Sequence, residues 1–347
     1  MKRQIDLNPL TSLKGIFIML IVFHNTQLIQ PLFTNLPGVD LISVFGGIFG
    51  NSMFFILSGF LISTGYRQRI TAHSLSFQSF LVRRLNKLYP AYLCSNLASL
   101  ILNIAIYGFS AINLQKIVFS ILLQQGSALS DSPPYNTPTW FLSALFVCYI
   151  LFFCVCFYFR TPTAYSCIIA SGIIWGYFLI SANLTLPFCY ESTGLALMNF
   201  FIGCALAELY PRLNHRIQRS GSIISFCTLL AILLLFLRYG VEIISGNVKV
   251  GFSFLICPLI LFLATSSPLF IRILNWKPLV FLGKISSHIF FWHLVLFHLF
   301  HTIFQYIIPN RAMTEMEYLL YLAGMLGFCV FLSALPRRQS EKSPVSQ

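Results

Sequence analysis

The chain has 347 residues, of which 57% are hydrophobic and only 9% are charged. Its mean hydropathy is +0.80, and phenylalanine alone contributes 36 residues. A soluble domain of this length cannot cover so much apolar surface with so little charge, so the composition excludes a soluble protein and predicts an integral membrane protein. No polar stretch is long enough to bury a core of its own. We therefore expect one membrane domain over residues 1–336, followed by a disordered cytoplasmic tail at 337–347.

The apolar residues gather in ten windows, each long enough to cross about 30 Å of hydrocarbon as a helix. Because every backbone polar group must be satisfied inside the membrane, such windows predict α-helices. The expected fold class is therefore an all-α, polytopic membrane helix bundle with about ten transmembrane helices. In chain order, the windows cover 10–29, 41–63, 88–108, 138–158, 163–182, 193–210, 221–239, 249–265, 278–303 and 317–335. A shorter amphipathic stretch at 114–124 is expected to be an interfacial helix in the loop after the third window.

Lysine and arginine residues are distributed unevenly between the loops. If the N-terminus is cytoplasmic, all but four of the 22 Lys and Arg residues fall in cytoplasmic segments. This positive-inside bias predicts that both termini are cytoplasmic. It also accounts for most of the net charge of +13, so no nucleic-acid partner is expected. The ten cysteines lie mostly within apolar windows and lack a metal-like spacing to histidine, and we interpret them as small core residues.

A dense group of cations lies in the loop between the second and third windows. It consists of Arg67, Arg69, Arg83, Arg84 and Lys87. The group can be a topology signal alone, or it can also hold a polyanion. If the segment is helical, Arg83, Arg84 and Lys87 can all face one anion, because they are spaced three and four residues apart. Guanidinium groups suit phosphates, and a cytoplasmic coenzyme A ester would fit such a site.

Polar residues inside the windows are candidates for chemistry, because burying them in lipid is costly. His24 lies toward the outer end of the first window, where a neutral imidazole can accept a proton from a hydroxyl near about pH 7. The alternative is an interfacial histidine bonded to water or to a backbone carbonyl. Trp140 opens the fourth window and, taken alone, is typical of an interfacial aromatic belt.

The ninth window is rich in polar residues for a membrane span. It reads FLGKISSHIFFWHLVLFHLFH and contains Ser286 and, near mid-membrane, His293. Its four histidines lack an accompanying carboxylate or cysteine pattern, so we expect no metal site. The chain also lacks the GxSxG, GxxxxGK[ST] and HExxH motifs, so hydrolase-elbow, P-loop and zinc-protease chemistry have no support.

Several segments, taken in order, resemble those of a known family. LKGIFIMLIVFH in the first window is similar to the opening segment of the acyltransferase 3 family of integral membrane O-acyltransferases. FFILSGFLIS, FLVRRLNKLYPAY, PTWFLSALF and LGKISSHIFFWH resemble later segments of that family, in family order across residues 10–300. The resemblance implies transfer of an acyl group, usually acetyl, from cytoplasmic acyl-CoA to a hydroxyl of an extracytoplasmic or lipid-linked glycan. It further implies the bacterial inner membrane as location, membrane lipid and a glycan as partners, acetyl-CoA as donor substrate and no bound cofactor.

The resemblance also implies roles for individual residues. His24 would be the catalytic base, and Arg83 and Arg84 would hold the phosphates of coenzyme A. The remaining cations of that site would be Lys87, Arg67 and Arg69. The supporting positions would be Lys14, Asn25, Ser58, Gly59, Trp140, Ser286 and His293.

One spacing departs from the family pattern. The family commonly has ten residues between its basic residue and its histidine, whereas nine lie between Lys14 and His24. At about 100° per residue, ten intervening residues would return the histidine to the face of Lys14. Asn25 takes that place here, and asparagine cannot act as a general base. Lys87 stands where the family usually has arginine, which keeps the charge but loses the fork-shaped geometry.

Two other functions stay open at this point. A transporter or flippase of a glycan or lipid intermediate is compatible with ten spans. Against it, Glu208 is the only acid well inside a predicted window, which leaves few charges for ion coupling. An inactive acyltransferase-like scaffold stays open because of the spacing between Lys14 and His24. The acceptor and a homo-oligomeric state are also left open.

Overall fold

The computed structural model describes residues 6–33, 38–125, 134–182, 184–213, 215–239, 248–309 and 311–335. Within these ranges nearly all regular structure is helical, which confirms the all-α fold class. The strands β1 (Thr185–Leu186) and β2 (Cys189–Tyr190) form one short antiparallel pair. The predicted tail at 337–347 lies outside the described residues.

The helices differ widely in length. The long ones are α1 (Asn8–Ile29), α3 (Asn51–Thr71), α4 (Phe77–Tyr107), α6 (Trp140–Tyr158), α7 (Pro162–Ser181), α8 (Glu191–Leu209), α9 (His215–Tyr239), α10 (Val248–Ser266), α12 (Lys277–Ile307) and α13 (Glu315–Ala334). The shorter α-helices are α2 (Val39–Val44), α5 (Leu114–Ile121) and α11 (Pro268–Leu274). A π-helix, η1, covers Phe45–Gly50, and 3₁₀ turns cover η2 (Phe109–Ala111), η3 (Thr137–Thr139) and η4 (Tyr210–Arg212).

The ten predicted windows correspond to ten helical units of the described chain. Eight helices are long and apolar enough to cross a membrane by themselves, and two bent pairs bring the number to ten. One pair joins α2 and the start of η1 to α3 with a bend of 40°, and the other joins α10 to α11 with a bend of 90°. The order of the predicted spans agrees with the structure, and their number reaches the predicted ten if each bent pair is one span.

The start of the third span differs from its window. α4 begins at Phe77, well before residue 88, because the side chain of Ser76 caps the helix by accepting a hydrogen bond from the backbone N–H of Ser79 at 3.2 Å. Arg, Leu and Lys are also good helix formers, which an apolar window does not register. As a result the second half of the basic loop is helical, and Pro90 lies inside α4.

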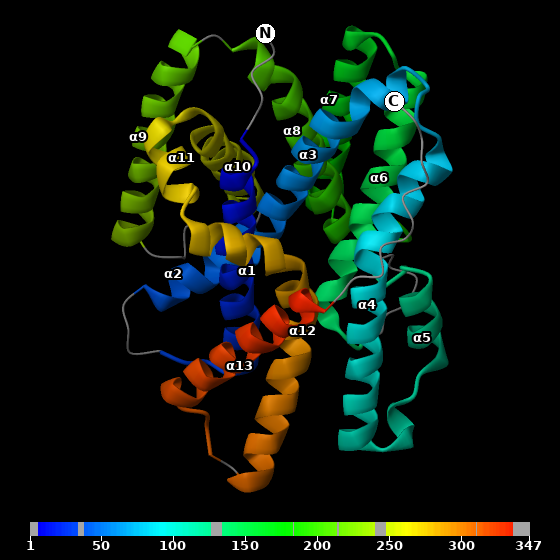
Figure 1. The fold of residues 1–347 in the computed structure, drawn as a ribbon, viewed down its shortest axis with the longest axis vertical. Helices are drawn as coiled ribbons and strands as arrows, with labels where there is room; N and C mark the ends of the chain where they lie inside the picture. Colours follow the sequence, from blue (N-terminus) through cyan, green and yellow to red (C-terminus); the bar gives the residue numbers. More distant parts are fainter. Residues whose placement is uncertain are drawn as a thin grey trace.

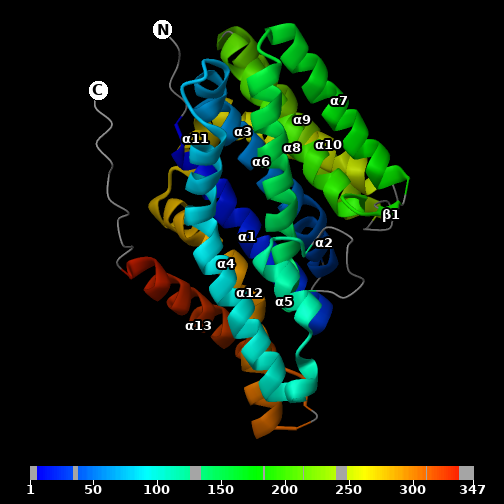
Figure 2. The ribbon, with the colours of Figure 1, turned by 90° about the vertical axis from the view of Figure 1, so that its right-hand side faces the viewer.

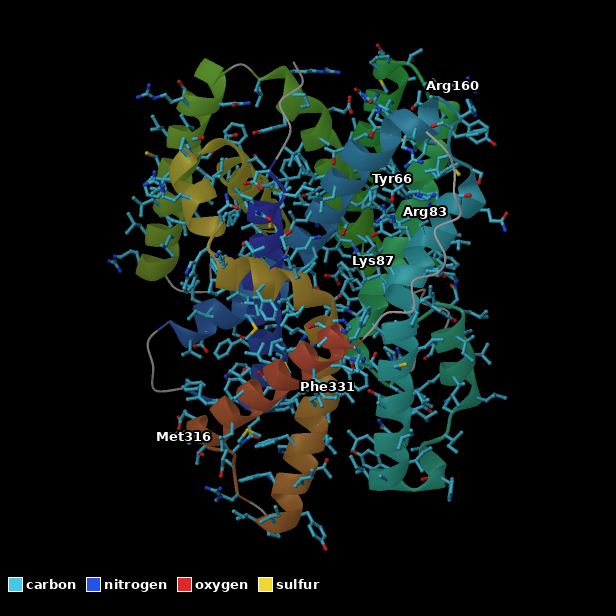
Figure 3. The ribbon with its side chains drawn as sticks, in the orientation of Figure 1. Tyr66, Arg83, Lys87, Arg160, Met316 and Phe331 are labelled. Atoms are coloured by element: carbon cyan, nitrogen blue, oxygen red, sulfur yellow. The ribbon has the colours of Figure 1, made fainter. Side chains whose placement is uncertain are left out.

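The cations mark one end of the molecule. Figure 1 shows the C-terminal ends of α3 and α8 and the N-terminal ends of α4 and α7 gathered at the upper end. Arg69 at the end of α3, Arg160 between α6 and α7, and Arg212 in η4 lie at this end, which we call the cationic end; Figure 3 labels Arg160 there. The positive-inside rule predicts that the cationic end is cytoplasmic.

The helix predicted after the third window is present as α5. It lies beside the half of α4 that is farther from the cationic end (Figure 2). The hydroxyls of Tyr89 and Tyr92 on α4 donate hydrogen bonds of 2.6 Å to the carbonyls of Ile121 and Ser120. Leu114, at the start of α5, remains exposed. An amphipathic helix that is hydrogen-bonded to α4 on one side and exposed on the other fits the predicted interfacial position.

Two helix crossings fix the centre of the bundle, and both depend on glycine. A Cβ atom on Gly283 of α12 would collide with the carbonyl of Thr11 on α1, and a Cβ on Gly15 would collide with the backbone of Gly283. Likewise, a Cβ on Gly59 of α3 would collide with the carbonyl of Phe200 on α8. Because lipid gives no hydrophobic driving force between helices, such close backbone approach is a main source of their association. Gly59, predicted as a supporting site residue, therefore lies in a packing contact.

Candidate active site

A cavity of about 530 Å³ lies between α1, α3, α4, α6 and α12. Five of the residues that the sequence singled out line it: Lys14, Ser58, Arg84, Lys87 and Ser286. Lys284, which the sequence analysis counted only as a topology signal, lines it as well. The structure therefore gathers residues from four separate helices, α1, α3, α4 and α12, into one space inside the bundle.

The crossing of α1 and α12 explains why cations from these two helices meet. Lys14 precedes Gly15 and Lys284 follows Gly283, so the close backbone contact places both lysines at the same level of the cavity. The like charges of Arg84 and Lys87, both on α4, also act on Lys14. The described residues that line the cavity include no Asp or Glu. A cavity with four cations and no acid in its described wall favours an anionic ligand.

Arg84 is held by aromatic rings. Its guanidinium carbon lies 4.4 Å from the ring centroid of Tyr66 and 6.0 Å from those of Phe80 and Tyr149. Its Nε is buried and has no hydrogen-bond partner among the described residues. Cation–π contacts orient a guanidinium without using its N–H donors. Arg84 therefore keeps donors available for an anion.

Arg83 and Lys87 both lie on α4, but only Lys87 is among the described residues that line the cavity. Figure 3 shows both on α4, near Tyr66 of the neighbouring α3, whose ring lies 5.5 Å from that of Phe80. Arg83 is exposed and is not among the described residues that line the cavity. At about 100° per residue, Lys87 lies about 40° from Arg83 and about 60° from Arg84, so helical spacing alone does not separate the three cations. The described cavity wall includes Arg84 and Lys87 and not Arg83.

The two arginines from the end of α3 are also away from the cavity. Arg67 forms an ion pair with Glu208 of α8, and its guanidinium carbon lies 3.8 Å from the ring centroid of Tyr165. Arg212 approaches the same carboxylate at 3.8 Å. Arg69 is exposed. These contacts tie α3 to α7 and α8, and the predicted coenzyme A contacts of Arg67 and Arg69 stay predictions.

His24 faces the bent segment that precedes α3. Its Nδ1 lies 3.3 Å from the hydroxyl of Ser43 on α2. Gly47 of η1 packs directly on the imidazole, where a Cβ atom would collide with the ring. His24 is half-buried and is not among the described residues that line the cavity. π-Helical turns such as η1 are rare and frequently occur at functional sites.

Asn25 faces α12 instead. Its Nδ2 donates a hydrogen bond of 3.0 Å to Nε2 of His293. Nδ1 of His293 lies 2.9 and 3.1 Å from the carbonyls of Phe290 and Ile289, which can only accept, so Nδ1 carries the proton. Lys14 and Asn25 therefore share the face of α1 that packs against α12, as the spacing between them predicted.

Several further residues complete the surroundings. Trp140 is half-buried at the start of α6, with its ring 6.2 Å from that of Phe55. Ser58 and Tyr149 both line the cavity wall. The sequence did not single out Tyr66 or Tyr149, and it marked Lys284 only as one of the cytoplasmic cations. His, Cys, Asp and Glu form no group of three that could hold a metal ion in the part of the chain that the structure describes.

Fold and cavity together define a class of protein, a polytopic α-helical membrane protein with a cationic cavity inside its bundle. The chain belongs to the acyltransferase 3 family, whose model, described as an acyltransferase domain, matches residues 8–334. The match spans almost the whole chain, so the family resemblance is confirmed and the protein is a membrane acyltransferase. The curated proteins and the solved structures compared gave no match.

Proposed function

We propose that the protein transfers an acyl group, acetyl by default, from cytoplasmic acyl-CoA to a hydroxyl of an extracytoplasmic or lipid-linked glycan. The observation that carries this proposal is the cavity with Lys14, Arg84, Lys87 and Lys284 in its wall and no acid among its described lining residues. Phosphates are the anions that such a set of ammonium and guanidinium groups suits best. The proposed setting is the bacterial inner membrane, with the cationic end in the cytoplasm where acyl-CoA is found.

The donor would bind with its phosphates on these four cations and its thioester toward Ser58 and Ser286, which line the same cavity. The acceptor hydroxyl then attacks the thioester carbonyl carbon. The carbon–sulfur bond breaks, the acyl group passes to the hydroxyl oxygen, and coenzyme A leaves as its thiolate. A base near the acceptor has to take the hydroxyl proton.

We assign the role of base to His24. Both ring nitrogens of His293 are engaged, one by backbone carbonyls and one by Asn25. In His24 only Nδ1 has a partner among the described residues, the hydroxyl of Ser43. If Nδ1 donates its proton to Ser43, Nε2 keeps the lone pair that a base needs. Transfer then requires His24 and the thioester to approach one another across the bundle.

The test is acyl transfer by purified protein in lipid nanodiscs, supplied with radiolabelled acetyl-CoA and a panel of glycan acceptors. His24→Ala is expected to lower turnover by about 10²-fold or more, the usual contribution of a general base. His301→Ala is the matched control, since His301 is a half-buried histidine of α12 stacked on Phe297. Full activity of His24→Ala would refute the assignment of the base. If wild-type protein neither binds coenzyme A nor consumes the thioester, a transporter or a scaffold becomes the better explanation.

A further inference from the structure

The lining of the cavity changes in a regular order with distance from the cationic end. Along α12, which runs away from that end, Gly283 and Lys284 come first, then Ser286 and Ser287, and then Phe290 and Phe291. Phe290 lies six positions after Lys284, which corresponds to about 9 Å along a helix. The cavity therefore begins with charge, continues with hydroxyls and ends with an aromatic ring on this helix.

Two other helices, which run in the opposite direction, also have phenylalanine as their lining residue farthest from the cationic end. On α3, which runs toward the cationic end, Leu61 and Ser58 are followed by Phe54 as the farthest lining residue. On α6, which runs the same way, Tyr149 is the nearest and Phe141 the farthest. Three separate helices thus end their share of the wall with phenylalanine.

These three phenylalanines form one layer, and we use the name Phe layer for Phe54, Phe141 and Phe290. Their ring centroids lie 5.3 Å (Phe141–Phe290), 6.2 Å (Phe54–Phe141) and 6.5 Å (Phe54–Phe290) apart. Such distances are typical of packed aromatic pairs. Each ring therefore contacts the other two, and the layer closes this end of the cavity.

The Phe layer is backed by further packing. Phe55 packs against Phe141 in a tilted arrangement, with ring centroids 4.1 Å apart. The side chain of Asn136 donates a hydrogen bond of 2.9 Å to the carbonyl of Phe291, which fixes α12 at the level of the layer. On the far side, the ring of His293 lies 6.3 Å from that of Phe290. Because the Phe layer is packed on several sides, moving its rings to admit a longer ligand would disrupt close packing and cost free energy.

The chemistry of the donor determines which part of it reaches this wall. In an acyl-CoA the phosphates and the acyl group are at opposite ends, and the acyl group is the apolar end. With the phosphates on the cations, the acyl group points toward the Phe layer along a wall that includes Leu88, Leu142 and Leu145. We propose, resting on the proposed function, that the Phe layer closes the donor cavity and sets the longest acyl group that the enzyme accepts.

The proposal predicts that removing a ring lengthens the cavity. Phe141→Ala and Phe290→Ala each replace a large side chain at the closed end with a methyl group. Burial of additional methylenes in an apolar pocket changes discrimination by about tenfold or more. Both variants should therefore shift the preference of the site from short to long acyl groups by at least about tenfold.

The test measures binding, so that it does not depend on turnover. Wild type and variants in nanodiscs are titrated with S-ethyl-, S-butyl- and S-hexyl-coenzyme A, thioethers that cannot transfer their alkyl group, in competition with labelled coenzyme A. The readout is the ratio of the S-hexyl to the S-ethyl affinity. Phe146→Ala is the matched control, because Phe146 is on the same helix and has the same exposed fraction, 7%, as Phe141, yet is not among the described residues that line the cavity.

The expected result is a rise of about tenfold or more in this ratio for Phe141→Ala and Phe290→Ala, with Phe146→Ala at the wild-type ratio. An unchanged ratio in both variants, while coenzyme A itself still binds, would overturn the role of the Phe layer and leave the proposed function intact. An equal rise in Phe146→Ala would also overturn it. If wild type binds no coenzyme A derivative, the proposed function fails and the inference fails with it. Phe141→Leu and Phe290→Leu replace any alanine variant that does not fold, with the same direction expected.

Discussion

Arg84 and Arg83 are adjacent in the chain but differ in what surrounds them. Arg84 lies over the ring of Tyr66 and lines the cavity, while Arg83 is exposed. We expect Arg84→Ala to weaken binding of labelled coenzyme A by about tenfold or more, since a charge-assisted contact contributes about 1.5–3 kcal/mol. Arg83→Ala should weaken it less, because a charge exposed to solvent is screened. Equal losses in the two variants would contradict the assignment of Arg84 to the donor site.

Residue types and spacing predicted part of the site. Helical spacing predicted that Arg83, Arg84 and Lys87 can face one anion, and the structure places Arg84 and Lys87 in the cavity wall. The register of Asn25 followed from counting residues from Lys14. The partner of Asn25 could not be predicted, because the hydrogen bond to His293 joins two residues that are 268 positions apart in the chain. Tyr66 could not be singled out either, since the chain has 15 tyrosines and no local pattern marks the one beside Arg84.

At the scale of the elements, the crossing of α1 and α12 positions two of the four cavity cations. Gly283→Leu would place a side chain against the carbonyl of Thr11 and force the helices apart. Overpacking of this kind costs about 1–3 kcal/mol, and it also separates Lys14 from Lys284. We expect a lower melting temperature together with weaker coenzyme A binding, measured by thermal unfolding and by ligand titration in the same preparation.

The matched control for this change is Gly327→Leu. Gly327 lies on α13, where a Cβ atom would meet nothing within 4 Å. Both substitutions add the same side chain within a long helix, so they share any change in helix propensity. A loss of coenzyme A binding in Gly327→Leu as large as that in Gly283→Leu would show that the crossing is not what positions the lysines.

The elements themselves were largely predictable, because length and hydropathy of a span are properties of the local sequence. Two details were not. The helix that carries Arg84 begins well before its apolar window, since a cap and good helix formers extend it. The π-helix over Phe45–Gly50 arises where glycines pack against α1, and that contact involves residues distant in the chain.

For the whole molecule, the proposed reaction depends on sidedness, because the cationic end must face the compartment that contains acyl-CoA. The positive-inside rule predicts this orientation, and it can be measured with a membrane-impermeant maleimide in right-side-out vesicles. In a background with the ten native cysteines replaced, Ser110→Cys, next to the end of α4 away from the cationic end, should react in intact vesicles. Arg69→Cys, at the cationic end, should react only after the vesicles are permeabilised. The reverse pattern would place Lys14, Arg84, Lys87 and Lys284 away from the cytoplasm, and the cavity could then not draw its donor from the cytoplasmic pool.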